Sequence, residues 1–351
     1  MDLRYLRSSV SVIVVTYNCR TDVRSCLDSV MGDPYYVAQT IVYDNASEDD
    51  TREVVAREYP DVVLVAGAAN MGFAGACNEA AAIAEGKFLA FLNPDAVVEP
   101  GWIGPLLDCV ADDPTVGAAM SMIVWSDDPR RVLASGNSVH PSGIAFRRDF
   151  GEPAKPGPPC EVGAITGGAV LIRRELFRRM NGFEGSFFMY YEDTDLSLRL
   201  GLMGLRCMVA PHSRVRHDHV ATVSARKLYY LERNRYLSLL SLTPHRLLGC
   251  MLPSMVYAEL LSWVFSLRMG PALTRAKACA WIDVWRRRSW VLRRRTQIAQ
   301  KCGSHSLRGA FTPRICLTYL GGASGRGVRV AEGVGDMLGR LSLALANLLK
   351  G

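Results

Sequence analysis

Carboxylates that directly follow apolar segments are the residues of this chain most able to do chemistry. Asp95 follows residues 87–92, a mostly apolar run, after an asparagine and a proline, and Glu192 and Asp193 follow two tyrosines. A carboxylate at the end of a buried strand can bind a divalent cation, which favours oxygen ligands and shares them with substrate phosphates. A carboxylate that reaches a hydroxyl can remove its proton as a general base. A turn after the proline explains Asp95 equally well, and Asp193 could be only a helix cap.

The acidic segment that contains Glu192 and Asp193 is expected to lead into a helix. Leu196, Leu200 and Met203 repeat at helical spacing, so the helix begins near residue 194. We expect the helix dipole to keep the acids at its N-terminus ionised. Four residues separate Asp195 from Arg199, a spacing that allows an ion pair on the helix surface. Glu192 and Asp193 would precede the helix and face a substrate more freely.

Three further polar clusters could bind a ligand. The first is Thr16, Tyr17 and Asn18, after an apolar run. The second begins at Asp44 and Asn45, whose side chains could bind ribose and base but could equally form a turn that caps the next helix. The third spans residues 70–78, where glycines open an alanine-rich helix whose N-terminus could meet phosphate; tight packing would explain them as well. Its candidate residues are Asn70, Gly72 and Asn78.

The elements that position these clusters alternate along the chain. Strands are expected at residues 10–15, 40–43, 62–65 and 87–92, and helices at 21–31, 51–58 and 74–84. This order predicts an α/β fold, Rossmann-like, with a mostly parallel sheet and helices on both faces. Ligands of such sheets bind at the carboxyl ends of the strands, where the polar clusters fall. Residues 127–159 are rich in proline and glycine and are expected to form an excursion over the site.

The character of the chain changes after about residue 225. Residues 227–242 predict a helix, and residues 247–267 form a mostly apolar stretch that is long enough to span a bilayer but contains Glu259 and Pro253. A basic segment with Trp281, Trp285 and Trp290 follows, which is typical of an interfacial anchor. We expect membrane association, peripheral or weakly integral. A buried helical hairpin would give the same pattern.

Composition and charge narrow the class of protein. The formal net charge is +7, with basic residues gathered after residue 199, which indicates an anionic partner such as phospholipid or nucleic acid. No nucleic-acid-binding motif is present, so we expect no nucleic-acid partner.

The ten cysteines form no CxxC pair and are expected to be reduced thiols. The apolar residues 10–15 are too short for a signal peptide, so we expect the catalytic part to stay in the cytosol.

Several ordered segments together resemble the family 2 glycosyltransferases, a group of inverting enzymes with a GT-A fold, and most closely the bacterial rhamnosyltransferases. The resemblance covers about residues 8–242. It includes motifs in addition to the polar clusters described above. These motifs are residues 11–18, 42–47, 70–75, 91–95, 166–169, 191–196 and 215–217, followed by Arg233 and Asn234.

The resemblance implies roles for individual residues. Asp193 matches the acid that serves as base, with Glu192 beside it, and Asp95 and His217 would hold a divalent cation, Mg²⁺ or Mn²⁺. Gly167, Gly168 and Tyr191 would contact the acceptor. The remaining matches would line the donor site: Thr16, Tyr17, Asn18, Asp44, Asn45, Asn70, Gly72, Asn78, Asn93 and Asp95. This sequence departs from the family pattern at Asn93, where a second carboxylate usually stands, so metal binding would be weaker or shared with the diphosphate.

The expectations combine into one hypothesis with one rival. A catalytic domain at residues 8–225 would transfer a sugar, with rhamnose from dTDP-rhamnose as first choice, by in-line displacement with inversion. The acceptor would be a saccharide or a polyprenyl-diphosphate-linked saccharide of the cell envelope, met at the cytoplasmic face of the plasma membrane. Residues 226–310 would associate with the membrane, and residues 311–351 would form a tail with a terminal helix. The rival is a non-catalytic module that binds a nucleotide sugar or lipid. The oligomeric state, a homo-oligomer included, stays open.

Overall fold

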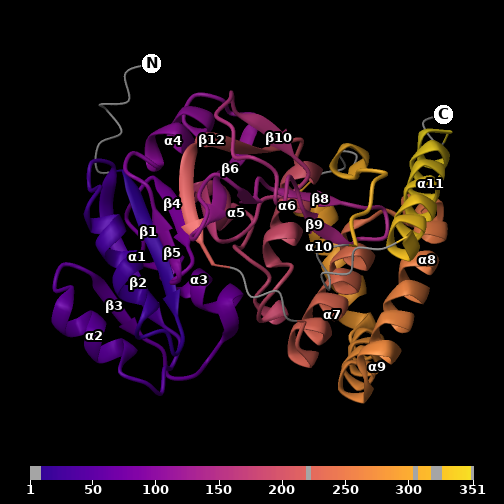
Figure 1. Cartoon of the computed structure of the whole chain (residues 1–351), viewed down its shortest axis with the longest axis horizontal. Coiled ribbons are helices and arrows are strands. Elements are labelled where there is room, and N and C mark those ends of the chain that lie inside the picture. The colour runs from indigo at the N-terminus through magenta and orange to yellow at the C-terminus, as the bar shows by residue number, and fades with distance from the viewer. Residues whose placement is uncertain (1–8, 219–222, 303–306, 318–325, 349–351) are drawn as a thin grey trace. The chain divides into compact units, whose positions relative to one another are not determined.

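The computed structural model describes residues 9–218, 223–302, 307–317 and 326–348. The chain divides into two compact units. The first contains Met1–Asn137, Arg147–Leu200 and Leu205–His219, and the second contains Ser138–Phe146, Gly201–Gly204 and Val220–Gly351. Strands dominate the first unit and helices the second (Figure 1).

The N-terminal half of the first unit alternates strands and helices, as the sequence predicts. Its strands lie in the order β4, β1, β2, β3, and all three pairings are parallel. The strands are β1 (Val10–Thr16), β2 (Val37–Asp44), β3 (Val63–Ala66) and β4 (Phe88–Leu92), and the helices between them are α1 (Asp22–Met31), α2 (Thr51–Glu58) and α3 (Gly72–Ala82). The carboxyl ends of these strands therefore share one edge of the sheet, where the polar clusters follow them.

The rest of the sheet is mixed in direction. β11 lies between β4 and β6 and is antiparallel to both, whereas β12 runs parallel to β6. The short strands β5, β7 and β10 pair antiparallel at its margins. The bounds are β5 (Ala96–Val98), β6 (Val116–Trp125), β7 (Val132–Ala134), β10 (Cys160–Val162), β11 (Ala169–Arg173) and β12 (Arg206–His217). The pairing of β5 with the end of β12 brings His217 opposite Ala96, next to Asp95.

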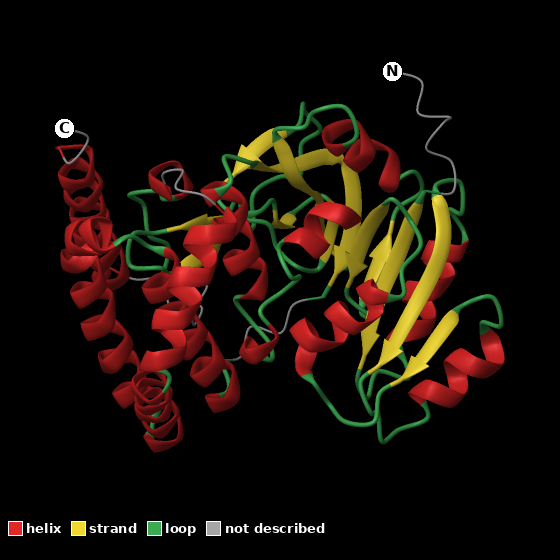
Figure 2. Cartoon of the chain, turned by 180° about the vertical axis from the view of Figure 1, so that it is seen from behind, coloured by secondary structure: helices red, strands yellow, loops and turns green. Residues whose placement is uncertain are grey.

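Helices cover both faces of this sheet, which explains the apolar run of β1. Val12 and Val14 face a core that also contains Leu27 of α1 and Leu106 of α4 (Ile103–Val110). On the other face, Phe91 packs against Phe177 of α5 (Arg174–Arg179) and against Phe183, with ring centroids 5.0 and 5.1 Å apart. Figure 2 shows helices on both faces of the sheet. A strand that is buried on both faces reads as a continuous apolar run.

The excursion expected at residues 127–159 contains short strands as well as loops. β7 lies at the margin of the sheet, and β8 (Asn137–Val139) pairs with β9 (Ala145–Arg147) in a separate two-stranded sheet. Strands of three residues give too short an alternation to stand out against the surrounding prolines and glycines.

The second unit is a bundle of helices. α7 (Ala225–Leu242) is capped by Ser224, whose hydroxyl accepts a hydrogen bond from the Lys227 amide at 3.1 Å. The following helices are α8 (His245–Met269), α9 (Pro271–Arg286), α10 (Arg288–Cys302) and α11 (Arg326–Leu348). Within the described residues, α8 is the one helix whose length and composition would allow it to cross a membrane, and a third of its most apolar window is buried in the protein.

Candidate active site

Thr16 and Asp44 end β1 and β2 side by side and are both fully buried. The Thr16 hydroxyl donates to Asp44 Oδ1 at 3.3 Å, and Asp44 Oδ2 accepts from the Ser47 amide at 3.1 Å and pairs with Arg52 at 3.0 Å. Asn18, in the left-handed region with a φ of 51°, accepts at Oδ1 from the Glu48 amide. These bonds fix two neighbouring loops at the carboxyl edge of the sheet, with Tyr17 exposed beside them.

Asn45 connects this edge to the start of α3. Its Nδ2 donates to Asn70 Oδ1 at 3.0 Å and to the Gly72 carbonyl at 3.2 Å, and its Oδ1 accepts from the Met71 amide at 2.8 Å. Asn78, also predicted to bind the donor, lies further along α3 and uses both polar atoms on the backbone of Phe183, at 2.9 Å each. Asn45 and Asn70 thus lie together at the strand ends, whereas Asn78 is engaged in holding α3 to residue 183.

Asp95 and His217 lie in contact, as the family resemblance implies. Asp95 Oδ1 lies 3.1 Å from His217 Nε2, and Asn93 Nδ2 lies 3.1 Å from the same nitrogen. The Asp95 side chain is 45% exposed, so the pair opens to solvent. Burial raises the pKa of the Asp95 carboxyl, but the hydrogen bond and charge of His217 outweigh it and hold this pKa below its ordinary value.

The hydrogen-bond partners of His217 make it a suitable metal ligand. Its Nδ1 contacts the carbonyl oxygen of Asp218, which requires a proton on Nδ1 and leaves Nε2 as the nitrogen that faces Asp95. A cation bound here would replace the Nε2 proton of the hydrogen bond to Asp95, and the imidazole and the carboxylate would share it as ligands. Among the described residues, no three His, Cys, Asp or Glu side chains gather as a complete metal site. Two protein ligands nevertheless fit Mg²⁺ or Mn²⁺ that is completed by substrate phosphate and water.

Asp193 lies in the first turn of α6 (Glu192–Leu202) and is held by three donors. Its Oδ2 accepts from the Gly167 amide at 2.9 Å, and its Oδ1 accepts from the Thr194 amide at 2.6 Å and from the Thr194 hydroxyl at 3.2 Å. Burial raises the pKa of the Asp193 carboxyl, and these donors offset only part of that effect. Asp193 is therefore a better proton acceptor than an ordinary aspartate.

Glu192 differs from its neighbour, and two predictions for this segment are wrong. α6 begins at Glu192, two residues before the expected start, so both acids belong to its first turn. Burial, followed by the charge of Asp193, raises the pKa of Glu192 well above its ordinary value, so the helix dipole does not decide its charge. Glu192 Oε2 is buried and has no hydrogen-bond partner within the described part of the chain. Since Asp193 accepts three hydrogen bonds, Asp193 rather than Glu192 is the ionised member of the pair.

The predicted pair of Asp195 and Arg199 exists, but it is buried rather than on the helix surface. Arg199 Nε lies 2.8 Å from Asp195 Oδ2, and both side chains are at most 3% exposed. Arg199 also donates to the carbonyls of Met180 and Gly182 at 2.9 Å. The pair ties α6 to the preceding loop and supports the first turn of α6. Tyr191, predicted to contact the acceptor, is buried beside that turn.

Gly167 and Gly168 join the two carboxylate sites. The Gly167 amide binds Asp193, and the Gly168 carbonyl accepts from the Asn93 amide at 3.1 Å. A Cβ atom at Gly168 would lie 3.3 Å from Asn93 Nδ2, closer than most side chains tolerate. Contacts therefore link five residues without a break, and we call this set the contact chain: Asp193, Gly167, Gly168, Asn93 and His217.

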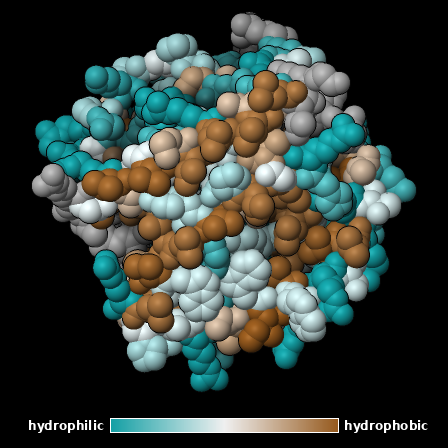
Figure 3. Space-filling model, turned by 90° about the vertical axis from the view of Figure 1, so that its right-hand side faces the viewer, coloured by the Kyte–Doolittle hydropathy of each residue, from teal (hydrophilic) through white to brown (hydrophobic). Residues whose placement is uncertain are grey.

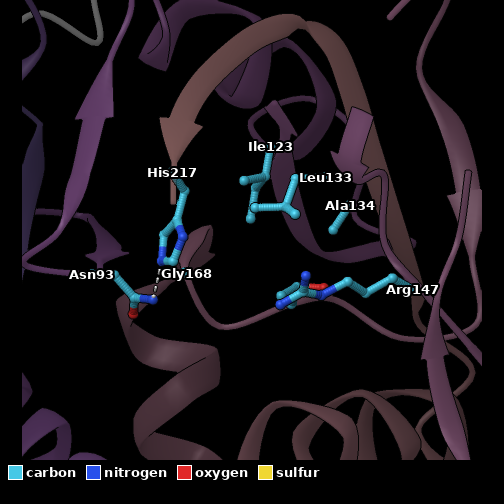
Figure 4. A pocket seen from close by; sticks show the side chains of 8 residues that line it. Asn93, Ile123, Leu133, Ala134, Arg147, Gly168 and His217 are labelled. Atoms are coloured by element: carbon cyan, nitrogen blue, oxygen red, sulfur yellow. Dashed lines mark hydrogen bonds between the residues drawn. The ribbon is translucent and has the colours of Figure 1, made fainter. Parts of the chain in front are cut away.

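A pocket of about 80 Å³ opens beside this contact chain. Figure 4 shows Asn93 and His217 on one side of it and the Arg147 side chain extending toward it from another. Arg147 was not predicted as a site residue, because it ends a three-residue strand within the proline-rich excursion and has no motif around it. The other lining residues are Ile123, Leu133, Ala134, Thr166 and Gly168.

Two family profiles match the sequence. The profile of glycosyl transferase family 2 matches residues 11–180, and that of glycosyl transferase family group 2 matches residues 144–291. All residues of the contact chain fall within the range that the two profiles cover together.

Curated relatives are similar to the chain at low identity. The N-acetylglucosaminyl-diphospho-decaprenol L-rhamnosyltransferase of Mycobacterium tuberculosis is 28% identical over 233 residues, which are 59% of this chain and 75% of the relative. The pre-mycofactocin glycosyltransferase of the same organism is 27% identical over 226 residues, 63% of this chain and 46% of the relative. The O-antigen biosynthesis protein RfbC of Myxococcus xanthus is 28% identical over 60% of this chain and 17% of its own length.

Solved structures share the fold. GalNAc-T7, solved with UDP, GalNAc and Mn²⁺, aligns with a TM-score of 0.57 at 16% identity, over 85% of this chain and 58% of that chain. Residues 1–349 of S. aureus TarS align with a TM-score of 0.52 at 14% identity, over 97% and 92% of the two chains.

Proposed function

Since the chain belongs to the family 2 glycosyltransferases and has their GT-A fold, we propose that it transfers a sugar from a nucleotide donor to an acceptor hydroxyl, with inversion and with Asp193 as base. The contact chain from Asp193 through the two glycines to His217 is the observation that carries this proposal. The proton acceptor Asp193 lies at one end of this contact chain, and His217, where the diphosphate charge would be bound, lies at the other end. A transfer reaction needs both groups around the same anomeric carbon.

In the proposed reaction, Asp193 takes the proton of the acceptor hydroxyl as the oxygen attacks the anomeric carbon. The bond between that carbon and the leaving oxygen of the nucleoside diphosphate breaks in the same step, which inverts the configuration. The raised pKa of Asp193 suits the residue to accept this proton. Glu192, with its own raised pKa, adds no second charge that would repel the diphosphate.

Asp95 and His217 would hold a divalent cation in this site. Such a cation supplies positive charge that offsets the charge gathering on the leaving diphosphate. With one carboxylate and one imidazole on the protein, the diphosphate would provide the remaining ligands, so cation and donor would bind together. Thr16, Asp44 and Asn45, at the neighbouring strand ends, would position the nucleoside.

For the donor sugar we propose L-rhamnose, carried by dTDP. The M. tuberculosis relative at 28% identity is named for rhamnosyl transfer, which supports this choice weakly. The pocket beside His217 supports it independently, because Ile123, Leu133 and Ala134 give it an aliphatic wall. Such a wall accommodates the methyl group of a 6-deoxy sugar better than a hydroxymethyl group, whose hydroxyl would lose its hydrogen bonds there.

For the acceptor we propose a saccharide linked to a polyprenyl diphosphate, used in cell-envelope polysaccharide synthesis at the cytoplasmic face of the membrane. The name of the same relative includes an N-acetylglucosaminyl-diphospho-decaprenol. An acceptor with a lipid tail would meet the enzyme at a bilayer surface.

Turnover of a panel of nucleotide sugars, with Mg²⁺, with Mn²⁺ and with a chelator, tests the proposal. We expect dTDP-rhamnose to be consumed fastest, with activity lost in chelator and restored by either cation. Leu133→Asn should reduce the preference for the 6-deoxy donor over its hydroxymethyl analogue by about tenfold. Binding of a nucleotide sugar without hydrolysis or transfer under any of these conditions would contradict the proposal and favour the non-catalytic module.

A further inference from the structure

The outer face of α8 is apolar between the two ends of the helix. From residue 247 to residue 267, every exposed position is a glycine or an aliphatic residue: Gly249, Leu252, Val256, Leu260, Val264 and Leu267. The last five recur every three or four residues and thus lie on one side of the helix. Leu260 and Leu267 are 61% and 63% exposed, although leucines in a soluble helix normally point inward.

α11 packs beside α8 and extends this apolar face. The Ser254 hydroxyl lies 2.8 Å from that of Ser342, and the Tyr257 hydroxyl donates to the Ala331 carbonyl at 2.8 Å, so the two helices run antiparallel. α11 exposes its own apolar row, made of Val330, Met337, Leu341, Leu345 and Leu348. We call these two rows together the α8–α11 face. Figure 3 shows hydrophobic side chains in bands across this side of the second unit, with hydrophilic ones around them.

The inner side of α8 forms polar contacts with neighbouring helices of the protein. These contacts favour a helix that lies on a bilayer over one that crosses it. Glu259 Oε2 accepts from Lys277 Nζ of α9 at 2.9 Å and from the Tyr236 hydroxyl of α7 at 2.6 Å. Its Oε1 accepts from Trp281 Nε1 at 2.5 Å. A crossing helix would have to bring these polar contacts into the hydrocarbon core, which is costly. One exposed apolar side with an anchored polar side is the pattern of an interfacial helix.

The charge around this face identifies its partner. Residues 226–351 contain 21 Lys and Arg against five Asp and Glu, whereas residues 1–225 contain 20 against 29. Arg246 and Arg268 stand exposed at the two ends of α8, and Arg329 and Arg340 are exposed on α11. This excess of positive charge opposes docking of the face on a second copy of itself and attracts anionic phospholipid headgroups.

We propose that the α8–α11 face docks this protein on the surface of an anionic bilayer, with both apolar rows inserted at the headgroup level and no helix crossing the membrane. The sequence pattern pointed to the basic, tryptophan-rich segment as the anchor, but the geometry assigns the contact to α8 and to α11. This surface is independent of the proposed transfer reaction, because no residue of the contact chain belongs to it.

Flotation of the full-length protein with vesicles tests the proposal without donor or acceptor. The vesicles contain phosphatidylcholine alone, or phosphatidylcholine with one third phosphatidylglycerol. We expect wild-type protein to bind the anionic vesicles, to bind the neutral ones more weakly, and to be released by alkaline carbonate. Leu260→Gln with Leu341→Gln should lower the apparent affinity for anionic vesicles about tenfold or more. Both sites are exposed, so the variant should keep the unfolding temperature of the wild type.

The matched control places the same changes on the first unit, at Val63 and Ile83, which are 39% and 46% exposed. Val63→Gln with Ile83→Gln should leave vesicle binding unchanged. Equal vesicle binding by the wild type and both variants would overturn the proposal. So would wild-type protein that resists carbonate, which indicates a crossing helix. A wild type that dimerises through this face in light scattering and ignores vesicles would overturn it in favour of a second copy.

Discussion

At the scale of single residues, the site depends on two adjacent carboxyls in different surroundings. Asp193 keeps some contact with solvent and accepts three hydrogen bonds, whereas Glu192 is buried and has an oxygen with no hydrogen-bond partner among the residues that the structure describes. The burial that raises both pKa values makes a doubly ionised pair costly. The charge is therefore concentrated on Asp193, the residue that we propose as the base.

Glu192→Gln should make the protein more stable at neutral pH. The folded state raises the pKa of Glu192 above its ordinary value of 4.5, so it binds this proton more tightly than the unfolded chain does. Stability from this group is present at low pH and is lost as pH rises above that value. We expect the variant to gain about 1 kcal/mol or more at pH 7 and to lose less stability between pH 5 and pH 8.

Urea unfolding across this pH range measures the effect. Glu175→Gln, at an exposed glutamate of α5, is the control and should change neither quantity. An identical pH dependence of stability in Glu192→Gln and wild type would show that Glu192 is already ionised in the folded protein.

At the scale of elements, local patterns predicted the first half of the sheet well and the second half poorly. The apolar run of β1 and the polar exits after Thr16 and Asp44 are signals within a few residues, and the structure confirms them. The place of β11 between β4 and β6, and the pairing of β5 with β12, depend on contacts between distant residues that no local pattern encodes. The contact of Asp95 with His217 came from the family resemblance.

The start of α6 and the position of Arg147 were missed for related reasons. Tyr190 and Tyr191 adopt positive φ values of 66° and 72°, which no sequence signal for large aromatic residues would predict. They lead the chain into α6 two residues earlier than the leucine spacing indicates. Arg147 lines the pocket from the end of β9, which pairs with β8 inside the excursion and is too short for a local pattern to predict.

Gly72→Ala should disturb the start of α3 and the loop before α6 together. Gly72 has a φ of 73°, and a Cβ atom there would lie 2.1 Å from the carbonyl oxygen of Phe188, so backbone must move. We expect a loss of about 2–4 kcal/mol in unfolding free energy, with weaker nucleotide binding. Gly101→Ala is the matched control, with a φ of 80° and open space around the added atom, and should cost only about 1 kcal/mol. Similar losses in both variants, measured by thermal unfolding, would mean that the contact with Phe188 is unimportant.

At the scale of the whole molecule, the two units differ in charge as well as in architecture. The second unit contains most of the positive charge, yet part of it is buried in a cluster that joins three of its helices. Lys277 is fully buried and binds Glu232 and Glu259, and Arg235 lies 2.7 Å from Glu232 and 3.4 Å from Glu259. These contacts connect α7, α8 and α9 and explain how a carboxylate can stand within the apolar α8.

Lys277→Met should destabilise the second unit. Methionine keeps a similar volume but leaves the buried Glu232 and the partly buried Glu259 without their lysine partner, which is expected to cost about 3–5 kcal/mol. Urea unfolding should show this loss, whereas Arg286→Met, at an exposed residue of the same helix, should stay within about 0.5 kcal/mol of wild type. A Lys277→Met variant as stable as wild type would show that the cluster contributes nothing net.

The kinetics of Asp193→Asn test the central claim most directly. Asparagine keeps the size of the side chain but cannot take a proton, so the donor should bind in the presence of Mn²⁺ with affinity close to that of wild type. Transfer to the acceptor should fall by about a hundredfold or more, and Glu192→Gln should lose much less. Measured side by side, unchanged transfer by Asp193→Asn would contradict the account and place the base elsewhere in the site.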